Sequence, residues 1–222
     1  MMRRLLQTIV VALLSVHSLG AQSDPTLYLV SYVEATPASR EQVAALLKQL
    51  ADNDRRGGAI RAEALQRTTE PNQYVLLEVW KDQQALTGNM GAAGTRQLRE
   101  RLAPLLLAPF DERRCIGTMV TPLGEGRANV YVVTHIDVPG NSRDAAMQLM
   151  RPLVDQSRRE PGNVRFDIVH QLDRTNHFTA IEAWSDQKSD DGHELASHTR
   201  TFRGGITPLL GALYDQRRYK PL

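Results

Sequence analysis

The sequence contains a single cysteine, Cys115, among its 222 residues. One cysteine cannot close an intramolecular disulfide, so the stability of the fold cannot depend on one, even in an oxidising compartment. We expect Cys115 to be a packed thiol; if it were exposed, it could link two copies of the chain.

An excess of charge of either sign is also missing. The sequence has 27 basic and 25 acidic side chains, and no run of Lys or Arg marks a nucleic-acid-binding stripe. Two of the basic residues, Arg3 and Arg4, lie in a segment that we expect to be removed, which leaves 25 side chains of each sign. The composition therefore gives no support for a nucleic-acid partner, despite a pI of 8.8.

Long hydrophobic runs are missing as well, apart from one at the N-terminus. Residues 5–19 are mostly apolar, but polar side chains interrupt them and they are fewer than the roughly 20 residues that span a bilayer. Basic residues precede this run and Gly20 and Ala21 follow it, a pattern typical of a secretory signal peptide. We therefore predict that residues 1–21 are cleaved and that the mature protein is periplasmic or secreted, with no membrane attachment. An uncleaved N-terminal anchor is the alternative.

The most informative feature that is present is an internal repeat. Residues 78–115 align without a gap with residues 182–219, and 16 of the 38 aligned positions are identical. A match of this length indicates a duplicated structural unit. We predict two units, residues 25–120 and residues 129–222, joined by a linker at 121–128 that is rich in Gly and Pro.

Each unit has the same predicted order of elements, β-α-β-β-α-β. Runs of β-branched and aromatic residues mark the strands, and apolar residues at i, i+3, i+4 and i+7 mark the first helix. The strands are expected at residues 27–33, 59–66, 74–80 and 111–119, and again at 130–138, 164–171, 178–184 and 214–219. The second helices are expected at residues 95–107 and 199–210, after a loop that runs through residues 88–94 in the first unit.

This order is the split βαβ pattern of a ferredoxin-like sandwich, in which helices cover one face of the sheet. The uncovered apolar face needs a partner, and a covalently linked second copy supplies one. We therefore predict an α+β fold in which two tandem ferredoxin-like units pair face to face within one chain. A further homo-oligomer is compatible with this arrangement.

The two copies differ at positions that carry chemistry. His193 and His198 stand in the second unit where the first unit has Asn89 and Gly94. Histidine is suited to proton transfer near neutral pH, so an active site is expected in the second unit. The alternative is that these histidines make only local hydrogen bonds.

Four segments of the second unit resemble the antibiotic biosynthesis monooxygenase family. They are Arg-Glu-Pro-Gly at 159–162, the strand 178–184 with Glu182, His-x-x-x-Ser-His-x-x-x-Phe at 193–202, and Pro-Leu-Leu at 208–210. The first unit resembles the family in its framework but lacks the histidines. The resemblance implies a dimeric α+β barrel, here formed within one chain. It also implies oxygenation of a phenolic or quinol-like aromatic small molecule by dioxygen without metal, flavin or haem.

In such chemistry a base removes a phenolic proton, the anion passes an electron to dioxygen, and the resulting peroxide collapses to a quinone. The protein supplies the base and hydrogen bonds to the oxyanion. His193 and His198 are the predicted catalytic residues, because they occupy the positions of the family's histidines.

Four further residues are predicted to bind the substrate. Trp184 offers an indole N–H to the substrate oxyanion, and Phe202 belongs to the family pattern. His135 and Tyr131 point to one side of the first strand of the second unit and are expected to line a cavity. Core packing is the alternative for Trp184, since its counterpart Trp80 stands in the copy without histidines.

We predict no metal site and no cofactor. The run from His193 to His198 is not the His-Glu-x-x-His helix of zinc proteases, since a spacing of five on one helix places two side chains about 140° apart. Asp190 and Asp191, close to the histidines, leave metal binding as an alternative.

Two other classes of function compete with an oxygenase. One is a binding protein for a small aromatic or lipophilic molecule, and the other is a structural interaction module. Haem is a disfavoured ligand, because relatives that degrade haem carry an axial histidine later in the last helix, where this sequence has none after His198.

Overall fold

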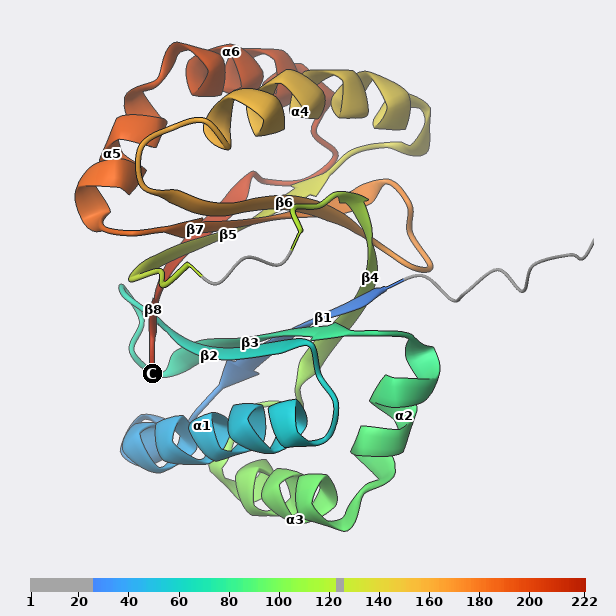
Figure 1. Ribbon diagram of the computed structural model, residues 1–222, viewed down its shortest axis with the longest axis vertical. Coiled ribbons are helices and arrows are strands. Elements are labelled where there is room, and N and C mark those ends of the chain that lie inside the picture. Colours follow the sequence, from blue (N-terminus) through green and yellow to red (C-terminus); the bar gives the residue numbers. More distant parts are fainter. Residues whose placement is uncertain (1–25, 123–125) are drawn as a thin grey trace, which may run out of the picture.

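The computed structural model of the protein describes residues 26–122 and 126–222. The predicted signal peptide, residues 1–21, lies outside these ranges. Among the described helices, none is long and apolar enough to cross a membrane. Two sheets face each other in the ribbon diagram, and helices cover their outer faces (Figure 1).

The two units have the same order of elements, and the predicted strands are confirmed to within two residues. The first unit contains β1 (Leu27–Glu34), η1 (Pro37–Ser39), α1 (Arg40–Arg56), β2 (Arg61–Arg67), β3 (Gln73–Trp80), α2 (Gln83–Gly91), α3 (Ala93–Leu102), η2 (Ala103–Leu105) and β4 (Asp111–Met119). The second contains β5 (Val130–Asp137), η3 (Gly140–Ser142), α4 (Arg143–Ser157), β6 (Asn163–Gln171), β7 (His177–Trp184), α5 (Gln187–Leu195), α6 (Ser197–Ile206), η4 (Thr207–Leu209) and β8 (Asp215–Pro221).

The predicted loop before the second helix is wrong, because each unit has an additional helix there, α2 or α5. The cause is local. The carboxylates of Asp82 and Asp186 accept a hydrogen bond from the backbone N–H three residues later, which satisfies a donor that the first helical turn leaves free. Both helices end at an extended residue, Ala92 or Ala196, which is also the N-cap of the next helix. The second helices begin two residues earlier than predicted and end earlier, because each gives way to a 3-10 turn that contains a proline.

The eight strands form one closed antiparallel barrel in the order β1-β3-β2-β8-β5-β7-β6-β4. The last strand of each unit pairs with both units. Strand β4 pairs with β1 and with β6 of the second unit, and β8 pairs with β5 and with β2 of the first. Closure leaves no free sheet edge, and it confirms the predicted α+β barrel of two ferredoxin-like units.

The faces of the sheets that lack helices pack against each other inside the barrel. This interior holds aliphatic and tyrosine side chains, among them Tyr28, Val75, Tyr131, Val133 and Tyr219. Cys115 belongs to the same group and is fully buried, as expected. The barrel interior is therefore a packed core.

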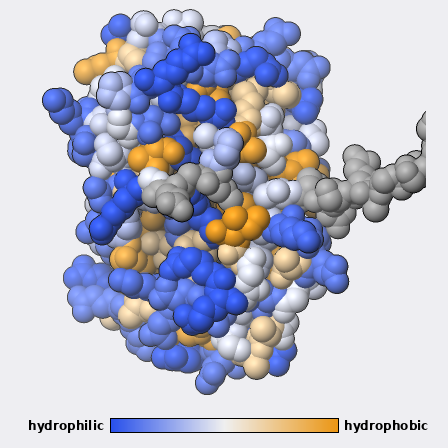
Figure 2. Space-filling model, in the orientation of Figure 1, coloured by the Kyte–Doolittle hydropathy of each residue, from blue (hydrophilic) through white to orange (hydrophobic). Residues whose placement is uncertain are grey.

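A second core in each unit lies between the sheet and its helices. In the second unit Phe166 and Trp184 of the sheet pack with Met150 of α4 and Phe202 of α6. Helix α4 continues through Pro152 to Ser157. On the face shown in Figure 2, hydrophilic residues dominate and apolar residues form separate patches. The candidate site lies at the edge of the second unit's helix-covered core.

Candidate active site

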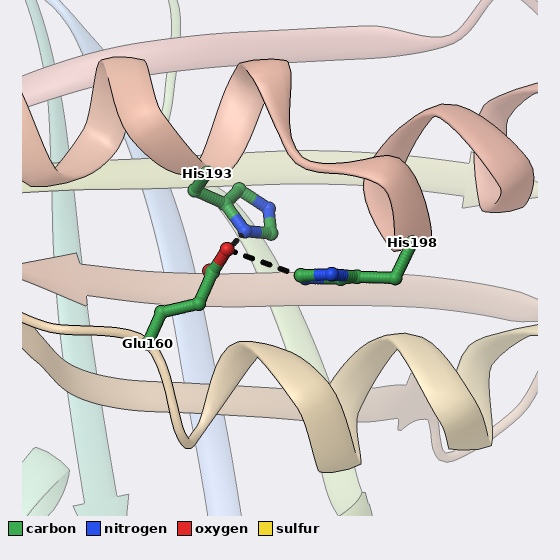
Figure 3. A group of neighbouring side chains, drawn as sticks. All are labelled: Glu160, His193 and His198. Atoms are coloured by element: carbon green, nitrogen blue, oxygen red, sulfur yellow. Dashed lines mark hydrogen bonds and ion pairs between the residues drawn. The ribbon is translucent and has the colours of Figure 1, made fainter.

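Three polar side chains of the second unit converge between separate elements (Figure 3). Glu160 lies in the turn between α4 and β6, His193 on α5, and His198 in the first turn of α6. Nδ1 of His193 lies 2.7 Å from Oε2 of Glu160, and Nε2 of His198 lies 3.4 Å from Oε1. We call these three residues the His–Glu cluster.

The break between α5 and α6 allows the two histidines to meet. Ala196 has φ −64° and ψ 146°, so the helix stops there and restarts in another direction. The expectation that a spacing of five separates the two imidazoles rested on one continuous helix, and the structure corrects it. The ring centroids of His193 and His198 are 5.7 Å apart.

His193 is held in an aromatic and almost dry environment. Its side chain is 3% exposed, and its ring centroid lies 4.8 Å from that of Trp184 and 5.5 Å from that of Phe166. Burial lowers the pKa of His193 below its ordinary value of 6.5, while the hydrogen bond and charge of Glu160 act in the opposite direction. Burial also lowers the pKa of His198. Both imidazoles are therefore neutral at neutral pH and able to accept a proton.

A hydrogen-bonded pair of a tryptophan and a glutamate occurs in both units, and in the second unit it lies next to the His–Glu cluster. Nε1–H of Trp184 donates to Oε2 of Glu182 at 3.2 Å, and Trp80 donates to Glu78 at 3.1 Å in the first unit. Burial raises the pKa of Glu182 to about 8, so its carboxyl group is uncharged at neutral pH. The indole N–H of Trp184 is thus already engaged, and this tryptophan supports the ring of His193.

The first unit has the same scaffold without the cluster. The positions equivalent to His193 and His198 are Asn89 and Gly94, and the turn at the end of α1, Arg56-Gly57-Gly58, has no carboxylate. Asn89 is buried and donates its side-chain N–H to the carboxylate of Asp54 at 2.7 Å. The convergence of two imidazoles on a carboxylate is therefore a property of the second unit and not a requirement of the fold.

Two cavities border the cluster. The larger, of ≈ 550 Å³, is lined by Glu160, His193 and residues of the neighbouring turn and of the start of α5, among them Pro161, Lys188 and Ser189. The smaller, of ≈ 190 Å³, lies between α4 and α6, where His198 meets apolar side chains that include Leu153 and Phe202. Each histidine thus borders one cavity, and Glu160 connects the two histidines.

The other predicted site residues are divided between the two faces of the sheet. Phe202 and Trp184 lie on the helix-covered side with the cluster. Tyr131 lies on the barrel side, where its hydroxyl donates to Glu63 at 2.7 Å and it borders a separate cavity of ≈ 510 Å³. His135 contacts Tyr32 at the end of the barrel. Burial and the nearby Arg113 lower the pKa of His135 to about 4.

Glu160 was not identified as a site residue by sequence reasoning, although a signal existed. The corresponding turn of the first unit, Arg56-Gly57-Gly58, has no carboxylate, just as the first unit lacks the two histidines. The aspartates considered as metal ligands have other roles: Asp190 is fully buried and accepts from Arg218 at 2.8 Å, and Asp191 accepts from Gln187.

The sequence matches the family described as antibiotic biosynthesis monooxygenase twice, over residues 26–101 and 129–204. It is also similar to a protein of Bacillus subtilis (strain 168) named "Putative monooxygenase YcnE". The identity is 27% over 86 residues, which are 39% of this chain and 90% of that protein.

Two crystal structures resemble almost the whole two-unit chain. A "Putative monooxygenase" from Fusobacterium nucleatum superposes with a TM-score of 0.80 at 12% identity, covering 90% of this chain and 93% of that chain. A second, from Lactobacillus acidophilus, gives a TM-score of 0.74 at 11% identity, covering 89% and 94%. At such low identity these likenesses establish the fold alone.

Proposed function

Because the chain belongs to the antibiotic biosynthesis monooxygenase family, we propose that it is an exported monooxygenase that oxidises a phenolic or quinol-type small molecule with dioxygen. The proposed catalytic group is the His–Glu cluster, which acts without a bound cofactor. The observation that carries this proposal is the hydrogen bond between Glu160 and the buried His193 at the wall of the ≈ 550 Å³ cavity.

The geometry fits a proton-accepting role. A proton must lie between Nδ1 of His193 and Oε2 of Glu160, since two lone pairs would repel each other at 2.7 Å. Oε1 of Glu160, a residue that lines the cavity, then remains as an acceptor for a phenolic proton, whereas Nε2 of His193 faces the hydroxyl of Thr199 at 3.4 Å and Oε2 of Glu182 at 3.7 Å. A carboxylate beside the ring stabilises the positive charge that a protonated imidazole acquires, and it also fixes the ring orientation.

The proposed reaction balances without a further reductant. Deprotonation gives a phenolate, which transfers an electron to dioxygen, and the radical pair combines at a ring carbon that bears hydrogen to form a peroxide. The cluster returns its proton to the peroxide and then removes the remaining proton from that carbon. The O–O bond breaks, one oxygen stays as the quinone carbonyl, and the other leaves as hydroxide, which takes up the proton and becomes water.

The test is dioxygen consumption by the metal-stripped mature protein with a panel of quinols and polyphenols. His193→Asn copies the residue that the first unit accommodates at the equivalent position, so the variant is expected to fold. It should lower the uptake rate by about 10²-fold or more, the range of acid–base catalysis. His177→Asn, a matched change at a histidine that pairs with Asp137 outside the cluster, should retain the wild-type rate.

Uptake no faster than autoxidation in buffer for every substrate would overturn the proposal. In that event the ligand-binding alternative is tested by thermal stabilisation of the same protein with the same compounds. Export is tested separately: expression of the full sequence should yield a mature protein whose intact mass lacks residues 1–21. A full-length mass would contradict export by signal cleavage.

A further inference from the structure

We propose that Glu160, His193 and His198 also form a binding site for one divalent transition-metal ion of the Zn²⁺ or Co²⁺ type. Two imidazole nitrogens and a carboxylate oxygen are ligands that such ions prefer, and this set occurs in zinc and non-haem iron sites. Over residues 26–122 and 126–222, this is the one group of three such side chains close enough to hold an ion.

The distances suit a metal with little rearrangement. One ligand atom from each residue lies within 4.8 Å of the others. Metal–ligand bonds of about 2.0–2.2 Å place neighbouring ligand atoms about 3.3–3.6 Å apart in a tetrahedral site. Here Nδ1 of His193 is 2.7 Å from Oε2 of Glu160, and Nε2 of His198 is 3.4 Å from Oε1. Small rotations of side chains would therefore bring the two nitrogens and a carboxylate oxygen of Glu160 onto one ion.

The surroundings of His193 are those expected of a metal ligand. A histidine that binds through one ring nitrogen usually donates the other N–H to a carboxylate or another oxygen. When Nδ1 faces the ion, Nε2 of His193 lies 3.4 Å from the hydroxyl of Thr199 and 3.7 Å from Oε2 of Glu182. The aromatic rings of Trp184 and Phe166 hold the imidazole plane.

Comparison with the first unit shows that the three ligands vary together. The supporting residues Glu182, Trp184 and Thr199 recur there as Glu78, Trp80 and Thr95. The three ligands do not recur: an amide and a glycine replace the imidazoles, and the turn Arg56-Gly57-Gly58 carries no carboxylate. A site that needs all three ligands would be lost or kept as a set, whereas the supporting residues occur both with and without it.

The site would keep open coordination positions. The described part of the chain offers three protein ligands, and the ≈ 550 Å³ cavity borders both Glu160 and His193. Water or another small ligand in that cavity can complete the coordination shell, as in catalytic zinc sites. The inferred site is therefore accessible from the cavity and does not need the chain to unfold.

A bound ion would suppress the base reaction. It would occupy the carboxylate and a nitrogen of His193, which otherwise share and accept the proton. This consequence, unlike metal binding itself, rests on the proposed function. Removal of the ion with a chelator should then raise the rate of dioxygen uptake by protein that carries it, and added Zn²⁺ should lower that rate.

The binding test uses tag-free, chelator-treated mature protein without substrate, because a histidine tag would bind the same ions. We expect calorimetric titration with Zn²⁺ to saturate at one ion per chain, and Co²⁺ to give the visible absorption of a site with nitrogen and oxygen ligands. Loss of an outer-shell partner commonly costs 10–100-fold in metal affinity, so His193→Asn or Glu160→Gln should weaken binding by more than about 100-fold. His177→Asn should leave the affinity unchanged, and circular dichroism verifies the fold of each variant.

The two proposals can fail separately. Stoichiometric binding that His193→Asn abolishes supports the metal site even if no substrate is oxidised. Dioxygen uptake without saturable Zn²⁺ or Co²⁺ binding overturns the metal site and leaves the oxygenase in place. Binding of equal strength in the wild type, His193→Asn and Glu160→Gln also overturns it, since the ion would then be held elsewhere.

Discussion

The buried carboxyl group of Glu78 on β3 should make the stability of this protein fall as the pH rises. Its side chain is 3% exposed, Oε1 accepts the N–H of Trp80 at 3.1 Å, and Oε2 has no hydrogen-bond partner among the described residues. Burial, aided by the negative charge of Asp54, raises the pKa of Glu78 to about 8. At neutral pH Glu78 is therefore uncharged in the folded protein.

The sign follows from proton linkage. The unfolded chain releases this proton near the ordinary pKa of 4.5, whereas the folded protein keeps it up to about 8. Between these values the folded state binds more protons, so each increase in pH favours unfolding. The resulting loss in the free energy of unfolding is absent below pH 4.5, grows up to pH 8 and is constant above it. One pKa unit corresponds to about 1.4 kcal/mol, so the difference of about 3.5 sets an upper limit of about 5 kcal/mol.

The measurement is the free energy of unfolding in urea for the wild type and Glu78→Gln. Glutamine stays uncharged at every pH, and its side-chain oxygen can still accept the N–H of Trp80. The two proteins should have similar stability at pH 5, and at pH 9 the variant should be more stable by up to roughly 4 kcal/mol. Comparing them at each pH removes the common effects of other titrating groups.

A stability difference that is the same at pH 5 and pH 9 would refute the reasoning. Glu182→Gln is the matched change in the second unit. At pH 9 it should also have a higher free energy of unfolding than the wild type, because burial raises the pKa of Glu182 to about 8 as well.

Three further outcomes are expected. The Cys115 thiol, whose pKa burial raises to about 12, should react with thiol reagents only after unfolding, so rapid labelling of the folded protein would contradict this. Asp186→Ala should remove the cap of α5 and lower the unfolding free energy by about 1 kcal/mol in urea titrations, with Asp82→Ala as the matched change. Residues 129–222 expressed alone should form a dimer by light scattering, because β6 and β8 lose the strands that pair with them in the first unit. A stable monomer would be the contrary result.

Local patterns were enough to predict the architecture. Residues such as Val43, Leu46, Leu47 and Leu50 recur at helical spacing, and all four are buried on α1 as that spacing implies. The repeat showed that one unit supplies the partner for the other's uncovered sheet. Helices α2 and α5 were missed because they are short and carry a glycine, although the capping aspartates Asp82 and Asp186 were visible in both copies.

Part of the candidate site could also be predicted from the sequence. His193 and His198 stood out because they interrupt an otherwise similar repeat. Their geometry could not be predicted, since it depends on the change of direction at Ala196. A single continuous helix would have kept the two imidazoles apart.

The sequence by itself thus determined the duplication, the strand and helix order and the unit in which to look for chemistry, because these depend on spacing along the chain. Only the tertiary structure decided that Glu160 joins the histidines, that β4 and β8 pair with both units, and that Tyr131 lies on the opposite face of the sheet from His193. Each of these depends on how distant elements pack. Spacing along a chain specifies which face of an element a residue occupies, but packing specifies what that face meets.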